Sequence, residues 1–135
     1  MGLILDTSVL VAGERRHIDL AALLRTRGAD EGIAIAAVTV AELLFGVERA
    51  LTPAIAMRRA AFADWVAESI PILPFGIAEA RRHATLRAHL TSAGTLIGPH
   101  DLQIAATALA RGYGVVTLDA AEFGRVPGLE VLAPA

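Results

Sequence analysis

The sequence contains neither cysteine nor lysine, and each absence excludes a group of protein functions. Without cysteine, disulfide bonds and thiol chemistry are impossible. All 12 basic residues are arginine. P-loop proteins, receiver domains and aspartyl-phosphate phosphatases are α/β proteins with acidic sites, but each of them depends on a lysine in its site. These three classes are therefore excluded.

Long apolar runs and targeting features are also missing. No apolar stretch approaches the roughly 18 uninterrupted residues of a membrane span. The N-terminus has no basic segment before an apolar region, so we expect no signal peptide and a cytoplasmic protein without a membrane partner. No repeat, low-complexity tract or linker interrupts the sequence, and a chain of 135 residues has the usual size of one domain. We therefore expect residues 1–135 to form a single domain.

Hydrophobic residues are abundant, whereas charged residues are few. They make up 55% and 19% of the chain, against about 45–50% and about 25% in ordinary soluble domains. A domain of this size has limited room to bury the excess by itself, so the composition predicts an additional interface. We expect this interface to join two copies of the chain in a homodimer or to bind a partner protein.

Short apolar runs alternate with longer helical patterns, which is typical of βαβ units around a mostly parallel sheet and predicts an α/β fold. The expected strands lie near residues 2–5, 33–37, 70–73, 114–118 and 129–132. The expected helices lie near residues 7–12, 17–27, 40–50, 53–68, 76–92 and 99–111. Prolines at positions 53 and 99 suit a first helical turn, and glycines at 28, 94 and 112 suit helix ends.

Four acidic residues stand where an apolar run ends or a helix is expected to begin, namely Asp6, Glu42, Asp101 and Asp119. In open α/β sheets, ligands bind beyond the carboxyl ends of the strands. Oxygen ligands that converge there suit Mg²⁺ or Mn²⁺. With these four set aside, 12 basic residues face 14 − 4 = 10 acidic ones, and this net charge of +2 permits phosphate binding.

Taken singly, three of these acids have a structural interpretation as helix caps. Residues 39–42 and 119–122 both fit the capping-box pattern, and Asp6 could cap a helix that begins at Thr7. Asp101 differs, because it lies on the apolar face of its expected helix together with Ile104, Ala105 and Ala108. Burying an unpaired carboxylate on an apolar face costs too much free energy to persist. We therefore predict that a cation binds at Asp101.

The remaining polar candidates have weaker signals. The hydroxyls of Ser8 and Thr117 could orient the carboxylates or cap local structure. The spacing of the four histidines does not match a zinc site. Of the four, only His100 is next to a candidate acid in the sequence. The four are His17, His83, His89 and His100. A serine triad is not expected, since the sequence has no G-x-S-x-G elbow.

Arginines are expected on two helices. They are Arg81, Arg82 and Arg87 on one helix and Arg58 and Arg59 on another. Such side chains could follow a nucleic-acid phosphate backbone, although a solvated helix face is the commoner explanation.

Four blocks of sequence together resemble the PIN-domain ribonucleases of the VapC toxin type. The opening strand and first acid are Leu3-Ile4-Leu5-Asp6-Thr7-Ser8, and the T-x-x-E-L-x-x-G block is residues 39–46. Residues 86–108 resemble the L-R-x-x-L…G…I-G-x-x-D-x-x-I-A-A block, and residues 117–129 resemble the T-x-[DN]-x-x-x-F…P-G-L ending. Many members of the family have asparagine at the position of Asp119. Residues 52–72 carry no family motif.

The resemblance implies a PIN-like α/β/α sandwich that cleaves single-stranded or looped RNA with Mg²⁺ or Mn²⁺ and leaves 5′-phosphate and 3′-hydroxyl ends. It implies Asp6 and Asp101 as metal ligands, Glu42 as a ligand or water-orienting base, and Asp119 as a second-metal or outer carboxylate. It also implies a VapB-type antitoxin. Two alternatives stay open: a housekeeping PIN nuclease in RNA maturation, and a PIN module that binds RNA or protein without turnover.

Overall fold

A computed structural model describes residues 2–134, and its centre is one five-stranded sheet in which each strand pair is parallel. The strand order is β3-β2-β1-β4-β5. The strands are β1 (Leu3–Leu5), β2 (Ile33–Ala36), β3 (Ile72–Leu73), β4 (Gly114–Val116) and β5 (Val131–Leu132). The α/β prediction is confirmed, and the sheet is parallel throughout these pairs.

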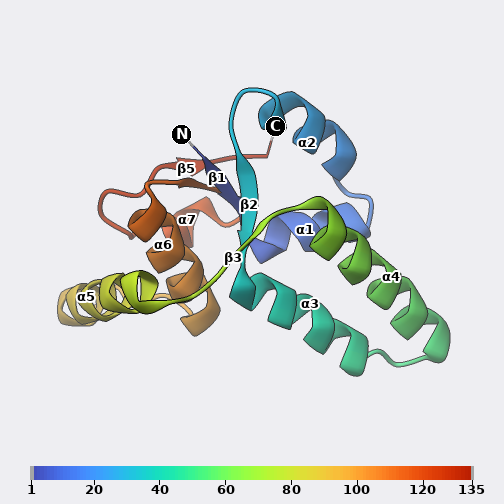
Figure 1. Cartoon of the computed structure of the whole chain (residues 1–135). Helices are drawn as coiled ribbons and strands as arrows, with labels where there is room; N and C mark the ends of the chain where they lie inside the picture. Colours follow the sequence, from blue (N-terminus) through green and yellow to red (C-terminus); the bar gives the residue numbers. More distant parts are fainter. Residues whose placement is uncertain (1, 135) are drawn as a thin grey trace.

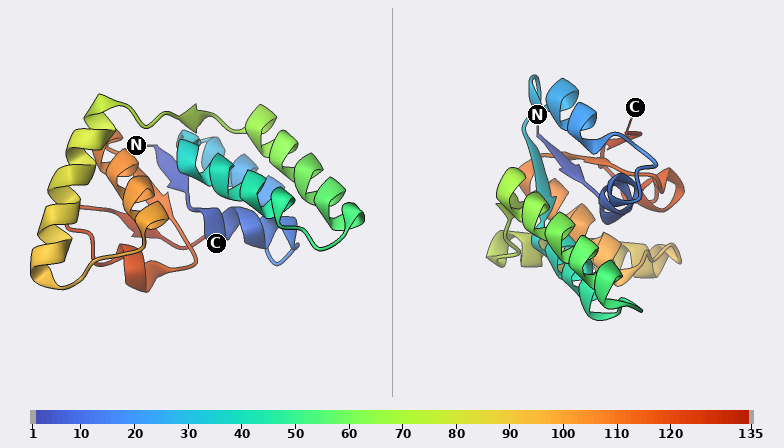
Figure 2. Two further views of the ribbon diagram at one scale, coloured as in Figure 1. Left: turned by 90° about the horizontal axis from the view of Figure 1, so that it is seen from below. Right: turned by 90° about the vertical axis from the view of Figure 1, so that its right-hand side faces the viewer.

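Helices cover both faces of this sheet and give three layers (Figure 1). They are α1 (Thr7–Glu14), α2 (Leu20–Gly28), α3 (Ala37–Glu48), α4 (Pro53–Ser69), α5 (Ile77–Ala93), α6 (Pro99–Arg111) and α7 (Ala120–Phe123). Figure 2 shows α3 and α4 as an antiparallel hairpin at one end of the molecule, with α5 at the other end. No helix within residues 2–134 has the length and apolarity needed to cross a membrane.

Alternation along the central strand separates two apolar cores. Leu3 and Leu5 point into the core formed with α1, α2 and α4, whereas Ile4 points into the core formed with α5, α6 and α7. All three side chains are completely buried. A strand covered on both faces is uniformly apolar, so a polar residue directly after it marks the edge of the sheet.

Glycine and proline fix several helix ends at the expected places. Gly94 and Gly112 follow α5 and α6 with φ of 70° and 69°, a left-handed conformation that glycine adopts without steric cost. Pro53 and Pro99 lie in the first turns of α4 and α6. Thr52 caps α4 by accepting a hydrogen bond of 3.2 Å from the Ile55 N–H.

Three local predictions differ from the structure. Helix α3 begins at Ala37 directly after β2, so Thr39 is buried inside the helix and the capping box at 39–42 is wrong. Helix α2 begins at Leu20, because the Asp19 side chain caps it through the Ala22 N–H at 3.0 Å. The short helix α7 is not among the helices expected from periodicity, since four residues are too few for a periodic pattern, although the capping-box pattern at 119–122 matches its start.

Candidate active site

The four predicted acids meet at the carboxyl ends of β1 and β4. These strands are parallel neighbours with Leu5 opposite Val116, so the residues that follow them leave the sheet at the same edge. Helix α3 supplies Glu42, and the first turn of α6 supplies Asp101. An open cavity of about 420 Å³ is lined by all four acids, and we call it the acidic cavity. Residues separated by more than 110 positions thus share one site.

Asp6 is held by two hydroxyl groups. The Ser8 hydroxyl donates to Asp6 Oδ2 at 2.6 Å, and the Thr117 hydroxyl donates to the same oxygen at 2.9 Å. The hydroxyls are fixed in turn, since Ser8 Oγ accepts from the Leu118 N–H and Thr117 Oγ1 accepts from the Asp119 N–H. The Asp6 side chain makes no cap hydrogen bond to α1 and is 3% exposed. Capping therefore does not explain this carboxylate.

Both oxygens of Glu42 have partners. The Thr7 hydroxyl donates to Oε1 at 2.8 Å, and His100 Nδ1 lies 3.1 Å from Oε2. Thr7 also lies 3.1 Å from the hydroxyl of Thr39, which explains the burial of a threonine in α3. The structure therefore gives His100 a position beside Glu42, where its ring can fix the orientation of that carboxylate.

Asp101 has the most perturbed acid group of the site. Burial, a hydrogen bond with Glu122 and the negative charges of neighbouring acids raise the pKa of Asp101 to about 8. The neighbours that act by charge are Asp6, Glu122 and Glu42. Without a cation, Asp101 is thus largely protonated at neutral pH, whereas a cation in the cavity favours its charged form.

Glu122 is a fifth acid, which the sequence prediction treated only as part of a cap. Carboxylate oxygens of Asp101, Asp119 and Glu122 lie within 4.8 Å of one another. Asp119 does cap α7, since its Oδ1 accepts from the Glu122 N–H at 3.3 Å. The Glu122 side chain, however, accepts from the Gly98 N–H at 2.7 Å. Its hydrogen bonds with Asp101 and with that N–H lower the pKa of Glu122.

The donor set fits a hard divalent cation. Its members are carboxylate oxygens, and the histidine beside them contacts a carboxylate. Oxygen ligands select Mg²⁺ or Mn²⁺, whereas sulfur and nitrogen ligands select zinc. Burial and the negative charges of neighbouring acids raise the pKa of Asp101, and a carboxyl group in such surroundings is a sign that the cavity accepts a cation.

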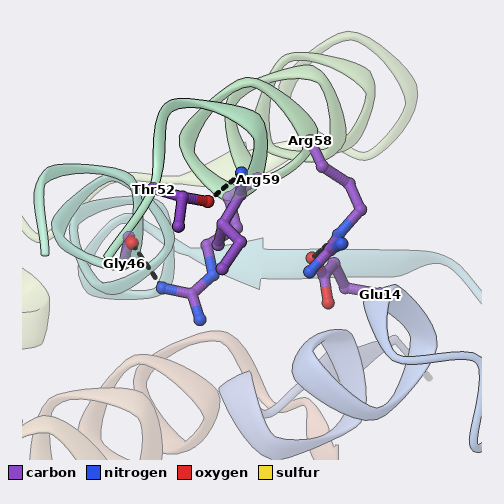
Figure 3. Close-up of polar contacts among 6 residues, drawn as sticks. Glu14, Gly46, Thr52, Arg58 and Arg59 are labelled. Carbon is purple, nitrogen blue, oxygen red and sulfur yellow. Dashed lines mark hydrogen bonds and ion pairs between the residues drawn. The ribbon is translucent and has the colours of Figure 1, made fainter. Parts of the chain in front are cut away.

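The arginines predicted from sequence lie elsewhere. Arg81, Arg82 and Arg87 belong to α5, and none of them lines the acidic cavity. Arg58 and Arg59 belong to α4, where Arg58 contacts Glu14 and Arg59 donates to the Gly46 carbonyl (Figure 3). RNA binding by these side chains stays a prediction.

Comparison with known proteins assigns the family. The PIN domain family matches residues 3–129. The chain belongs to the PIN domain family. It is 38% identical to ribonuclease VapC1 of Rickettsia felis over 98% of this chain and 96% of that protein. It is 34% identical to the tRNA(fMet)-specific endonuclease VapC of Salmonella typhimurium over 72% of this chain and 71% of that one.

A solved structure supports the same assignment. This PIN domain matches VapBC2 of Rickettsia felis, crystallised with a DNA fragment from its promoter, with a TM-score of 0.89 and 28% identity. The match covers 98% of each chain. The resemblance to VapC-type PIN ribonucleases and the α/β/α fold are therefore confirmed.

Proposed function

We propose that this PIN domain is an endoribonuclease toxin that hydrolyses RNA phosphodiester bonds with Mg²⁺ or Mn²⁺ and leaves 5′-phosphate and 3′-hydroxyl ends. The observation that carries the proposal is the convergence of Asp6, Glu42, Asp101 and Asp119 on one cavity. The VapC relatives are ribonucleases, which supports RNA as the substrate.

The residues have distinct roles in this proposal. A bound divalent ion supplies an activated water and stabilises negative charge on the scissile phosphate. Asp6 and Asp101 are its ligands, and Glu42 is a further ligand or the base that orients the water. Asp119 and Glu122 form an outer acidic pair that fits a second ion. Ser8 and Thr117 fix the Asp6 carboxylate, which limits the ways that a cation can be held.

A VapB-type antitoxin is the proposed inhibitor. Several structural neighbours are complexes of VapB with VapC, which supports such a partner here. Within residues 2–134, the ion-pair contacts of the carboxylates that line the acidic cavity are limited to that of Glu42 with His100, so the other carboxylates are available to an inserted arginine. A guanidinium would gain charge-assisted hydrogen bonds there.

A homodimer is the proposed assembly. Large apolar side chains remain exposed on the single chain, among them Phe45 at 62%, Met57 at 73% and Ile77 at 72%. Large apolar side chains that are exposed on a single chain are often covered in a subunit interface. The mass measured by light scattering at tens of micromolar, well above the dissociation constant of an obligate dimer, tests the assembly.

The direct test of the proposed function is cleavage of an end-labelled RNA by the purified protein. With Mg²⁺ or Mn²⁺ we expect fragments that carry a 5′-phosphate, detected by ligation, and a 3′-hydroxyl, detected by polymerase extension. Excess EDTA is expected to stop cleavage, and added metal is expected to restore it. Undiminished cleavage in EDTA would overturn the metal-dependent mechanism.

A further inference from the structure

A second cavity lies directly beside the acidic cavity, between α1, α3 and α4. It has a volume of about 200 Å³ and contains the side chains of Arg15, Arg49 and Arg59 in its wall. We call it the arginine cavity. Its remaining wall consists of Glu14 and of apolar side chains, among them Phe62. Three of the 12 arginines of the chain therefore gather around one small volume.

The wall of the arginine cavity has a net positive charge, because it contains three arginines and one acid. Glu14 is its one acid, and it already pairs with Arg58, whose Nε lies 3.4 Å from Oε1 (Figure 3). Arg59 donates from Nη1 to the Gly46 carbonyl at 2.8 Å, which orients the guanidinium but leaves its charge uncompensated. Among residues 2–134, none of the three wall arginines forms an ion pair. The cavity thus has the charge and the donors for an anion.

The two cavities share part of their walls. Val11 and Arg15 line both the arginine cavity and the acidic cavity. An extended ligand can therefore occupy both at once, with one group at the carboxylates and the next group at the arginines. Arg15, at the end of α1, lies between the two positions.

RNA is the ligand that we expect to occupy both the acidic cavity and the arginine cavity. The acidic cavity holds several carboxylates and repels a polyanion until metal is bound, so substrate capture requires a positive site within a Debye length of about 8 Å. An RNA strand carries a phosphate on every nucleotide, and a guanidinium binds phosphate through paired N–H donors. The Phe62 ring adds an apolar surface on which a ribose or base can rest.

We propose that the arginine cavity binds a backbone phosphate of the RNA next to the phosphate that is cleaved, with Arg15 as the nearer contact and Arg49 and Arg59 behind it. This inference rests on the proposed function and extends it, since it specifies how a chain with net charge −2 captures a polyanion. The cavity acts on binding and leaves the chemical step to the carboxylates.

Steady-state cleavage of a short single-stranded RNA separates these roles. We expect Arg15→Gln and Arg49→Gln to raise KM by about tenfold while kcat changes by less than about twofold, because a phosphate contact positions substrate. The dependence of log KM on log salt is expected to flatten by about 0.7 for each lost contact to a single strand. Arg25→Gln is the matched control, since Arg25 is exposed on α2 and lines neither cavity. Melting curves verify that the variants fold.

Uncharged linkages in the RNA can identify the phosphate that the arginine cavity binds. For this purpose, one phosphate of the RNA at a time is replaced by a methylphosphonate. In the wild-type protein, a single position beside the scissile bond is expected to raise KM, whereas the same substitution is expected to have no further effect in Arg15→Gln. Independent, additive effects of the two changes would overturn the proposal, because a direct contact is lost only once.

The outcomes separate this inference from the proposed function. If RNA is cleaved with normal KM by Arg15→Gln and Arg49→Gln, the inference fails while the nuclease function stands. The same holds if these variants weaken only the binding of an antitoxin peptide, since the cavity then serves a protein partner. If neither Mg²⁺ nor Mn²⁺ supports cleavage, the nuclease function fails. RNA binding in EDTA, measured by anisotropy, then tests the cavity alone, and affinity unchanged by Arg15→Gln overturns it.

Discussion

The acidic cavity and the arginine cavity share Val11 and Arg15 in their walls but differ in how their charges are held. In the acidic cavity, hydroxyls and a histidine fix Asp6 and Glu42, and the carboxyl group of Asp101 has a pKa raised to about 8. In the arginine cavity, guanidinium groups keep their charge in any environment, so no shift of their pKa values relieves their mutual repulsion. The first arrangement needs a cation, and the second needs an anion.

The two cavities suit different parts of the proposed function. In the proposed function, catalysis requires ligands held to a fraction of an ångström, and the carboxylates stand on strand ends and helices with fixed neighbours. Capture of a flexible polymer would require charge more than precision, and long arginine side chains at the ends of α1 and α3 and on α4 suit that proposed role.

The largest effect is expected from the acidic cavity. Asp6→Asn or Asp101→Asn should lower kcat for RNA by at least about 10³-fold, because each removes a charged metal ligand. The fold should be retained, and the melting temperature in EDTA should not fall for Asp101→Asn, since repulsion among the acids is reduced. Cleavage assays and melting curves on the same preparations measure both. Near-normal kcat in either variant would remove that residue from the site.

An antitoxin arginine that enters the acidic cavity is expected to compete with metal. Raising Mg²⁺ should weaken the complex by a few-fold, and Asp101→Ala should weaken it by about tenfold, as expected for loss of a charge-assisted pair. Substitution of the inserted arginine should restore cleavage without releasing the partner fully. Calorimetric titrations at several Mg²⁺ concentrations measure the competition. If the affinity for the antitoxin changed neither with Mg²⁺ concentration nor in Asp101→Ala, inhibition would act outside this cavity.

A pH dependence of stability follows from the raised pKa of Asp101. In the unfolded chain this group titrates near 3.8, whereas in the folded chain it titrates near 8. Between these values the folded state binds the extra proton, so metal-free stability should decrease as pH rises from about 4 to about 8. Asp101→Asn should remove that decrease, as should saturating Mg²⁺ at the high end. Melting temperatures in EDTA across this range measure the slope, and equal slopes in wild type and variant would contradict the assignment.

The smallest effect is expected from α5. Arg82 lies in the wall of a separate cavity with His89, and none of Arg81, Arg82 and Arg87 reaches either cavity described above. Arg82→Gln should change KM for RNA by less than about threefold, because a distant surface charge acts only through screened attraction. An effect as large as that of Arg15→Gln would extend the RNA path to α5 and support the sequence-based prediction that its arginines bind RNA.

Several features could be predicted because they depend on residues close in sequence. Gly94, Gly112, Pro53 and Pro99 end or begin helices through their own backbone preferences, and the structure has them in those places. Apolar runs with no polar interruption indicated strands covered on both faces. The positions of the acids after such runs indicated an edge of the sheet, since parallel strands end together.

Other features depended on contacts between distant segments. The pattern at 39–42 fits a cap in sequence, but α3 begins at Ala37, and the Thr7 hydroxyl instead contacts both Thr39 and Glu42. The pattern at 119–122 is a real cap for Asp119, yet the Gly98 N–H and Asp101 draw the Glu122 side chain away. His100 gained its position beside Glu42 in the same way. No local pattern contains these partners.

The sequence by itself determined which chemistry is available: carboxylates without lysine or cysteine, placed at the ends of buried strands, and arginine as the one permanent cation. Tertiary structure alone decided which of these groups act together. Strand order brings residues 6 and 119 to one edge, and the packing of α1 against α3 and α4 gathers three arginines beside them. The physical reason is that charge interactions depend on distance in space, and only the folded chain sets those distances.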